Sequence, residues 1–361
     1  MGAISLTQAA PSTVHSISGY VKFDTIFDQE NDGGNDQALV KLSGDEASDE
    51  EGDINLASVE SRIKIQSLTT GTPMGLTKSV IEADFFSGGK FGLRHAYFTN
   101  KGLTFGQTWS TFMDLSALPE KVDFGGAAAR IFSRKSLVKY SLPVAGGIAD
   151  LALEAPIYSV NEEQDAATPD IIAKYTHNSF FGYLSGGVLI QNINVDNTTT
   201  DQDTSTPGDQ LGTLNKSKMA VAARFSGRIN MGKDNLKFAL IAGQGLGSYI
   251  NFGDTETGSI SASGTSIDLS DTVATRISFQ HFWSPTLRST LVYGKTTADI
   301  AGVDSGDYQS THANLIYAPY KTHKFGGEFI NASKVNQNNL DGSKNSDSKL
   351  NRIQFFAKYA F

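Results

Sequence analysis

The connections between the expected strands are sorted by length along the chain, and this constrains the fold more than any other feature. About sixteen segments alternate apolar and polar residues, as β-strands do, and helical stripes at i, i+3 and i+4 are hard to find. Every second connection is a tight turn, such as 143–146 or 232–235. The long connections all fall in the other set: 29–53, 110–129, 194–214, 250–270 and 336–348. Outer-membrane barrels have short periplasmic turns and longer extracellular loops. The sequence therefore predicts an all-β fold, a transmembrane antiparallel β-barrel of about 16 strands with both chain ends in the periplasm.

The expected strands carry apolar residues on one face and polar residues on the other. In the segment 57–67, Val59, Ile63 and Ile65 alternate with Glu60, Arg62, Lys64 and Gln66. Apolar or aromatic residues also stand at alternate positions of the last segment, up to Phe361. In a closed barrel the last strand pairs with the first and faces lipid, so its aromatic side chains lie at the bilayer interface. The expected strands are 14–28, 54–68, 76–87, 91–99, 102–109, 130–142, 147–158, 169–177, 179–193, 215–231, 234–249, 271–283, 286–298, 307–318, 322–335 and 349–361.

Composition narrows the setting further. The chain has no cysteine, which excludes disulfides, thiolate zinc sites and cysteine nucleophiles. It also lacks a run of about 18 apolar residues, so no membrane-spanning helix is expected. The net charge of −8 is concentrated in one place, because residues 28–53 carry ten acids against Lys41 alone. Such a run predicts a solvated loop, and a divalent-cation site near a charged membrane surface is the alternative.

Three stretches carry a resemblance to a known family. They are SISGYVKFDTIFD at 16–28, ADFFSGGKFGLRHAYFTNKGLTFGQTWSTFMD at 83–114 and LPEKVDFGG at 118–126. These stretches resemble the DcaP-like porins, and the final strand looks like the outer-membrane signal read by the barrel-assembly machinery. The resemblance implies a homotrimer of 16-stranded barrels in the bacterial outer membrane, in contact with lipids and lipopolysaccharide. It implies that each barrel takes up small anions such as dicarboxylates.

The same resemblance bears on the domain division. Family members can carry a periplasmic coiled-coil extension before the barrel, whereas only about 13 residues precede the first expected strand of this chain. We therefore expect residues 1–13 to form an N-terminal periplasmic segment and residues 14–361 to form the barrel.

The arginines bear on which solutes pass. All nine fall within, or at the first residue of, the expected strands, and most lie on the polar face. An arginine on the lipid face costs about 2–4 kcal/mol at the bilayer midplane, so these side chains are expected in the lumen. There a guanidinium group can bind a carboxylate with two parallel hydrogen bonds. The predicted pore-lining residues are Arg62, Lys64, Arg94, Arg130, Arg134, Arg224, Arg228, Arg276, Arg288, Arg352 and Lys358. The alternative is that the arginines only pair with lumen acids such as Glu60, Glu82, Asp84, Asp150 and Glu154.

The connection 110–129 is the third on the long side, which in general porins folds inward and narrows the pore. Its acids Asp114, Glu120 and Asp123 are expected to face the arginine wall across this constriction. Gly125 and Gly126 would let the chain turn back to the wall. The alternative is a surface loop with ordinary acids.

Other functions have little support. The six histidines show no HExxH pattern and no close pair, and we expect no metal site, no cofactor and no nucleic-acid partner. The sequence therefore predicts a porin and not an enzyme. An outer-membrane hydrolase with a rim active site is the alternative, which a Ser or Asp near His281 or His312 would favour. A barrel without a conducting pore is a third possibility, although sixteen strands normally leave an aqueous channel.

Overall fold

The computed structural model describes residues 10–31, 53–157, 168–197, 214–251, 257–260, 266–299, 306–336 and 348–361. Most of the expected N-terminal segment 1–13 and most of the acidic stretch 28–53 lie outside these residues. The described chain is almost entirely β-strand, and its one helical turn is η1 (Leu115–Ala117). None of the described helices is long and apolar enough to cross a membrane.

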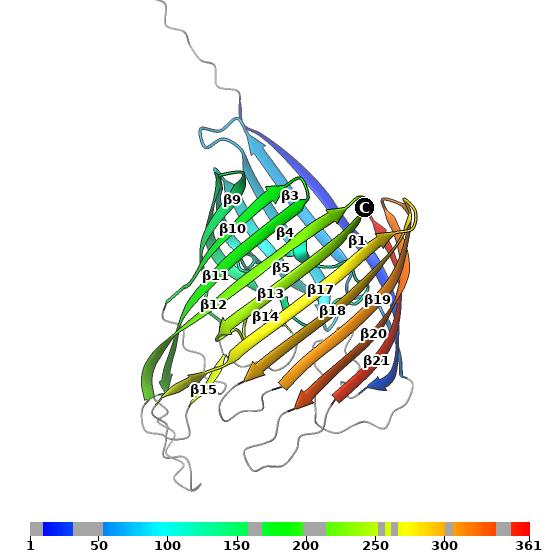
Figure 1. The fold of residues 1–361 in the computed structure, drawn as a ribbon. Helices are drawn as coiled ribbons and strands as arrows, with labels where there is room; N and C mark the ends of the chain where they lie inside the picture. The colour runs from blue at the N-terminus through cyan, green and yellow to red at the C-terminus, as the bar shows by residue number, and fades with distance from the viewer. Residues whose placement is uncertain are drawn as a thin grey trace, which may run out of the picture.

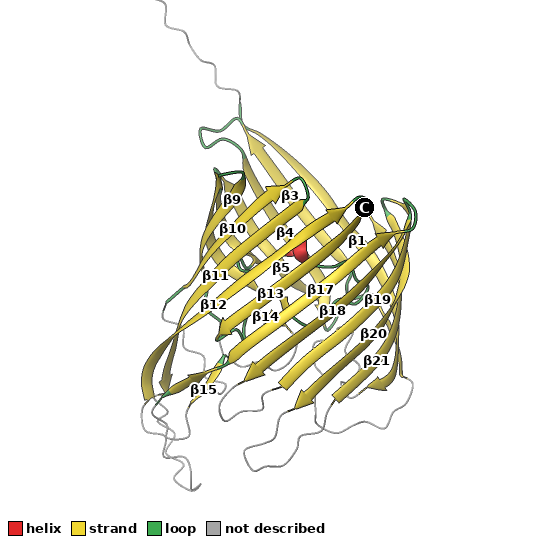
Figure 2. Ribbon diagram, viewed as in Figure 1, coloured by secondary structure: helices red, strands yellow, loops and turns green. Residues whose placement is uncertain are grey.

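Seventeen strands form one closed antiparallel sheet (Figures 1 and 2). They are β1 (Ser12–Asn31), β2 (Asp53–Ala57), β3 (Arg62–Thr70), β4 (Thr77–Ser87), β5 (Lys90–Asn100), β6 (Leu103–Trp109), β8 (Arg134–Val144), β9 (Gly147–Glu154), β10 (Asp170–Ser179), β11 (Gly182–Asn197), β12 (Leu214–Met231), β13 (Asp234–Gln244), β17 (Asp271–Phe282), β18 (Leu287–Asp299), β19 (Gly306–Tyr320), β20 (His323–Asn336) and β21 (Ser348–Ala360). Strands β2 and β3 both pair with β1 and make one crossing between them. The predicted barrel of 16 strands is therefore confirmed.

The last strand closes the barrel against the first, as its aromatic pattern predicts. Strand β21 pairs with β1 from Tyr20 opposite Ala360 to Asn31 opposite Leu350. The terminal residue takes part, because the backbone N–H groups of Gly19 and Phe361 each donate to the other's carbonyl. The side chains of Phe355, Tyr359 and Phe361 are about half exposed on the outer face, whereas Phe356 points inward.

Alternation along the strands separates a lipid face from a lumen face. In β17 the outward side chains of Val273, Ile277 and Phe279 are exposed, while those of Ala274 and Arg276 are buried inside the barrel. The short turns, from β3–β4 to β19–β20, lie together at the upper end of Figure 1, which we call the turn end. The long connections belong to the opposite end, the loop end.

Three differences from the expected strands involve segments that turn into the lumen. The expected strand 130–142 is divided into β7 (Arg130–Ile131), which is not part of the barrel, and β8. The expected strand 234–249 ends at Gln244, and the chain then turns into the lumen. The expected strand 54–68 is interrupted at 58–61, between β2 and β3, where the backbone turns so that Glu60 points inward. In each case a tertiary contact inside the barrel replaces the ladder that alternation alone predicts.

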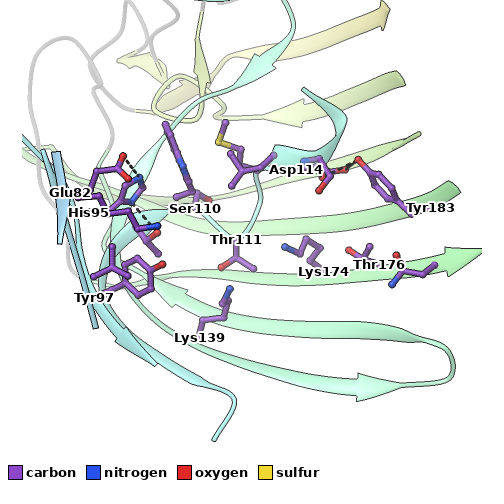
Figure 3. A pocket seen from close by; sticks show the side chains of 18 residues that line it. Glu82, His95, Tyr97, Ser110, Thr111, Asp114, Lys139, Lys174, Thr176 and Tyr183 are labelled. Atoms are coloured by element: carbon purple, nitrogen blue, oxygen red, sulfur yellow. Dashed lines mark hydrogen bonds and ion pairs between the residues drawn. The ribbon is translucent and has the colours of Figure 1, made fainter. Parts of the chain in front are cut away.

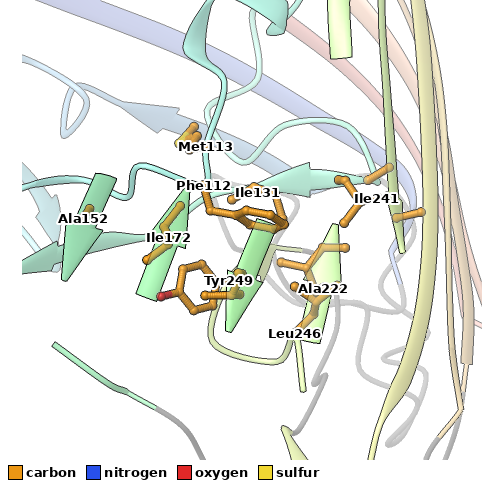
Figure 4. Close-up of a cluster of buried hydrophobic side chains, with 13 residues drawn as sticks. Phe112, Met113, Ile131, Ala152, Ile172, Ala222, Ile241, Leu246 and Tyr249 are labelled. Carbon is orange, nitrogen blue, oxygen red and sulfur yellow. The ribbon is translucent and has the colours of Figure 1, made fainter. Parts of the chain in front are cut away.

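An apolar core lies inside the barrel near the loop end (Figure 4). Two chain segments that enter the lumen meet there, because β7 pairs with β14 (Ile250–Asn251). The short strands β15 (Gly258–Ile260) and β16 (Ile267–Leu269) form a separate hairpin. The core packs Phe112, Met113, Ala129, Ile131, Leu246, Tyr249 and Ile250 of these segments against Ala152, Ile172, Leu189, Ala222, Ile241 and Ala274 of the wall. One side of the lumen is thus filled by protein.

Candidate functional site

Residues 110–129 form the lumen loop, which leaves β6 after Trp109 and crosses the interior of the barrel. Its first turn is short and capped, since the Asp114 carboxylate accepts the Ser116 N–H at 3.1 Å where η1 begins. Its return depends on Gly126, whose φ of +98° suits glycine. A Cβ atom at Gly126 would overlap the guanidinium group of Arg130. The loop contacts the inner wall of the barrel at several points along its course.

Three cations of the wall hold the lumen loop by its backbone. Arg224 donates through Nε to the carbonyl of Phe112 at 2.7 Å, and Lys237 donates to that of Leu118 at 2.6 Å. Arg276 donates to the carbonyls of Ala129 and Ala117 at 2.8 and 3.4 Å. Arg224 and Arg276, predicted as pore-lining, therefore serve to fix the loop.

The carboxylate of Glu328 holds the tip of the lumen loop. It accepts the backbone N–H groups of Val122 and Asp123 at 2.9 and 3.1 Å, and the side-chain amide of Asn314 at 2.9 Å. The imidazole of His312 lies 3.1 Å away, and both side chains are fully buried. A buried carboxylate is stable when its oxygens are hydrogen-bonded in this way.

Glu120 makes a second connection between the lumen loop and the wall. Arg288 donates to its two carboxylate oxygens at 2.5 and 2.6 Å, and Lys324 donates at 3.0 Å. Burial alone would raise the pKa of Glu120, but the hydrogen bond from Arg288 and the charge of Lys324 outweigh it and lower the pKa to about 2. The lowered pKa keeps this carboxylate ionised at neutral pH, where it accepts hydrogen bonds from both cations.

The other loop acids also have direct partners. Asp114 accepts hydrogen bonds from Ser226 and Tyr183 and lies 3.6 Å from Arg224. Asp123 accepts the Gly126 N–H at 2.5 Å, and its carboxylate lies 3.9 Å from Arg352. The loop acids thus touch wall arginines directly, instead of facing them across open space.

Other predicted arginines pair with acids of the wall, as in the alternative interpretation. Arg62 lies 3.1 Å from Glu82, and Arg94 lies 2.5 Å from Asp84. Arg352 binds Asp28 with two hydrogen bonds of 2.7 Å. Each of these pairs lies on the inner face of the barrel and is largely buried. These cations have part of their charge neutralised locally.

A third group of predicted cations has no acid within ion-pair distance in the described part of the chain. Arg130 donates only to the carbonyl of Phe124 and stacks on Phe132. Arg134, Arg228 and Lys358 contact aromatic rings. The predicted residue Lys64 and the unpredicted Lys139 line the cavity described next. The parity of Lys139 in β8 points to the lumen, but the ambiguous start of that strand hid it from sequence reasoning.

Two cavities lie beside the lumen loop. The larger, of about 460 Å³, runs between the first half of the loop and the wall from β3 to β11, and Lys64, Lys139 and Lys174 line it (Figure 3). The smaller, of about 330 Å³, lies between residues 118–124 and the wall from β19 to β3, with Arg62 and Lys358 in its lining. Both cavities reach β3, where Lys64 lines the larger cavity and Arg62 lines the smaller one. Basic side chains thus border the open space on both sides of the loop.

The described residues offer no grouping that would hold a metal ion. The acidic stretch 28–53, where a cation site was the alternative, lies mostly outside them. The histidines named for a hydrolase do have neighbours: His281 lies 2.8 Å from Asp234 near the turn end, and His312 contacts Ser310 and Glu328.

A family comparison decides the assignment of the chain. The model of the family described as DcaP outer membrane protein matches residues 7–361. The chain belongs to the DcaP outer membrane protein family. The resemblance noted in the sequence is thereby confirmed, and with it the location in the bacterial outer membrane and the porin class of channel. The turn end accordingly faces the periplasm and the loop end the cell exterior.

Solved structures support the same fold. The outer membrane channel DcaP of Acinetobacter baumannii is 23% identical, with a TM-score of 0.79 and 97% of each chain covered. The anion-selective porin from Comamonas acidovorans is 12% identical, with a TM-score of 0.61 over 97% of this chain and all of the other. The trimer form of OmpT from Vibrio cholerae is 11% identical, with a TM-score of 0.59 over 97% of this chain and all of the other. No curated protein matches the chain.

Proposed function

We propose that this DcaP-family chain forms a water-filled channel for passive diffusion of small, preferably anionic solutes such as dicarboxylates. One observation carries the proposal: lumen cations outnumber their acidic partners. Each acid of the described lumen contacts a cation or a loop group, as Glu82, Asp114 and Glu328 do. Lumen cations with neither an ion pair nor a hydrogen bond to the loop in the described chain include Lys64, Arg134, Lys139, Arg228 and Lys358. Rings of basic side chains of this kind favour anions in pores.

The lumen loop narrows the channel in this proposal. Residues 110–129 and the apolar core beside them fill one side of the lumen, so a solute has to pass along the basic wall from β21 through β3 to β10. Fixed cations on that path can replace part of an anion's hydration shell, and weak binding lets the anion leave again. A dicarboxylate can engage two cations at once, which a monocarboxylate of similar size cannot.

Liposome swelling tests this preference directly. Proteoliposomes that contain the protein should swell faster in a small aliphatic dicarboxylate than in a diamine of the same chain length. The physical reason is that the two solutes match in size and differ in the sign of their charge. Equal swelling rates, or faster entry of the diamine, would contradict the proposed anion preference while leaving the channel itself intact.

We further propose a homotrimer, as the trimer form of the OmpT structure supports by analogy. Unboiled protein in mild detergent should then migrate on a gel as a compact trimer and convert to the unfolded monomer only on heating. Migration as a folded monomer under the same conditions would contradict this assembly.

A hydrolase is the rival function, and one arrangement favours it. The imidazole of His312 lies between two polar groups: its Nε2 is 3.2 Å from Ser310 Oγ and its Nδ1 is 3.1 Å from Glu328. This is the connectivity of a Ser–His–Glu triad. Against it, Ser310 and His312 are at most 1% exposed, and Ser310 Oγ already accepts the Ala128 N–H at 2.9 Å. We therefore propose that these residues anchor the loop and that the chain is not an enzyme. Labelling of Ser310 by a fluorophosphonate probe in the folded protein would favour the hydrolase instead.

A further inference from the structure

We propose that Arg134 is a carboxylate-binding residue of the lumen, and that Trp109 and Phe132 are the positioning residues that hold its guanidinium group. The inference rests on the proposed anion preference and deepens it, since it assigns one binding residue and a ligand class, small carboxylate anions. It also makes an uncharged side chain a determinant of how long an anion stays in the channel.

Arg134 differs from its neighbours in having no hydrogen-bonding partner among the described residues. It is the first residue of β8, paired with Trp109 of β6 and only half-buried. Its Nη1 atom is buried without a hydrogen bond. By contrast, Arg62 and Arg94 share the carboxylates of Glu82 and Asp84. A guanidinium group in the lumen with no acid beside it is an unfilled carboxylate site in chemical terms, because its donors match a carboxylate in geometry and charge.

Two aromatic rings hold the Arg134 side chain in place. Its guanidinium carbon lies 4.9 Å from the centre of the Trp109 ring and 5.5 Å from that of Phe132. The rings also pack on each other, with 4.9 Å between their centres. Cation–π contacts stabilise such an arrangement and fix the plane of the group, so less conformational freedom is lost when an anion binds.

The surrounding charge favours an anion at this point. Arg94 lies over Trp109 at 5.6 Å and Arg130 lies over Phe132 at 3.6 Å, so three guanidinium groups gather around two rings. Of these three, only Arg94 contacts acids within the described chain. A carboxylate bound to Arg134 would reduce the repulsion among the three cations. Trp109, over whose ring the Arg134 guanidinium group lies, lines the larger cavity, so Arg134 is next to that open space.

Single-channel blockades by succinate test the inference in a planar bilayer. Arg134→Lys keeps the charge but removes the fork of donors, so the blockade lifetime should shorten about tenfold while the reversal potential in a salt gradient stays the same. Phe132→Leu removes no charge and should shorten the lifetime roughly two- to fivefold. Phe132→Tyr keeps the ring and should restore the wild-type lifetime.

Trp283→Leu is the matched control, because this ring is 62% exposed at a periplasmic turn and contacts none of the three arginines. It should leave the blockade lifetime unchanged. An anion-preferring wild-type channel whose blockades are equally long in Arg134→Lys and Phe132→Leu would overturn the inference and leave the proposed function standing. A wild-type channel without anion preference would instead overturn the proposed function. If Phe132→Leu does not insert, Arg134→Lys alone decides between these results.

Discussion

Replacing Glu328 with alanine is expected to release the tip of the lumen loop and to raise the single-channel conductance, with a noisier open state. The wild-type carboxylate accepts the N–H groups of Val122 and Asp123 and so ties this part of the loop to β20. Leaving a buried backbone N–H group without its acceptor costs about 1–3 kcal/mol. That cost falls on loop docking, because the barrel ladder of β20 does not depend on this side chain. Conductance in a planar bilayer measures the effect.

The control for this variant is Asp150→Asn. Asp150 is another inward carboxylate, paired with Lys174 at 3.0 Å, but it does not contact the lumen loop. It should leave the open-channel noise as in the wild type. If Glu328→Ala conducts with the same amplitude and noise as the wild type, the loop must be held in place without the Glu328 carboxylate.

Replacing Gly294 with valine is expected to displace the return half of the lumen loop and to lower the thermal stability. Gly294 faces inward on β18, and a Cβ atom there would lie on the carbonyl of Ala128 in the loop. Forcing extra methyl groups into such a contact typically costs about 1–3 kcal/mol. The variant should therefore unfold at a lower temperature and conduct differently from the wild type, measured by circular dichroism in detergent and in a planar bilayer.

Gly186 offers a matched comparison for Gly294. It also lies within a barrel strand, but it faces outward, and a Cβ atom there would meet nothing within 4 Å. Gly186→Val should leave both the melting temperature and the conductance close to those of the wild type. Equal losses of stability in the two variants would show that strand glycines matter for the ladder and not for loop contact.

Much of the fold follows from the sequence because the determinants of a barrel are local. Alternation in segments such as 57–67, and the sorting of short and long connections, sufficed to predict the closed antiparallel barrel and the inward side of most arginines. The final strand was likewise predictable from its aromatic residues. In a membrane every barrel strand has apolar residues on its lipid face, so each segment shows the alternation of apolar and polar residues by itself.

The site was less predictable because its contacts join residues far apart in the sequence. Arg276 looked like a solute-binding residue, but its donors bind the carbonyls of Ala117 and Ala129. Glu328 and His312 carry no local motif, and their role depends on where residues 122–123 meet β20 and β19. Parity tells which side chains face the lumen, but only the course of the loop decides which of them remain without a partner.

The sign of the reversal potential in a salt gradient across a planar bilayer tests the central claim most directly. We expect a reversal potential of the sign that anion preference gives. Neutralising four of the unpaired cations together, in the variant Lys64→Gln, Arg134→Gln, Lys139→Gln and Lys358→Gln, should bring the reversal potential close to zero. A cation-preferring wild-type channel, or anion preference that survives all four substitutions unchanged, would contradict the claim that these side chains select the solute.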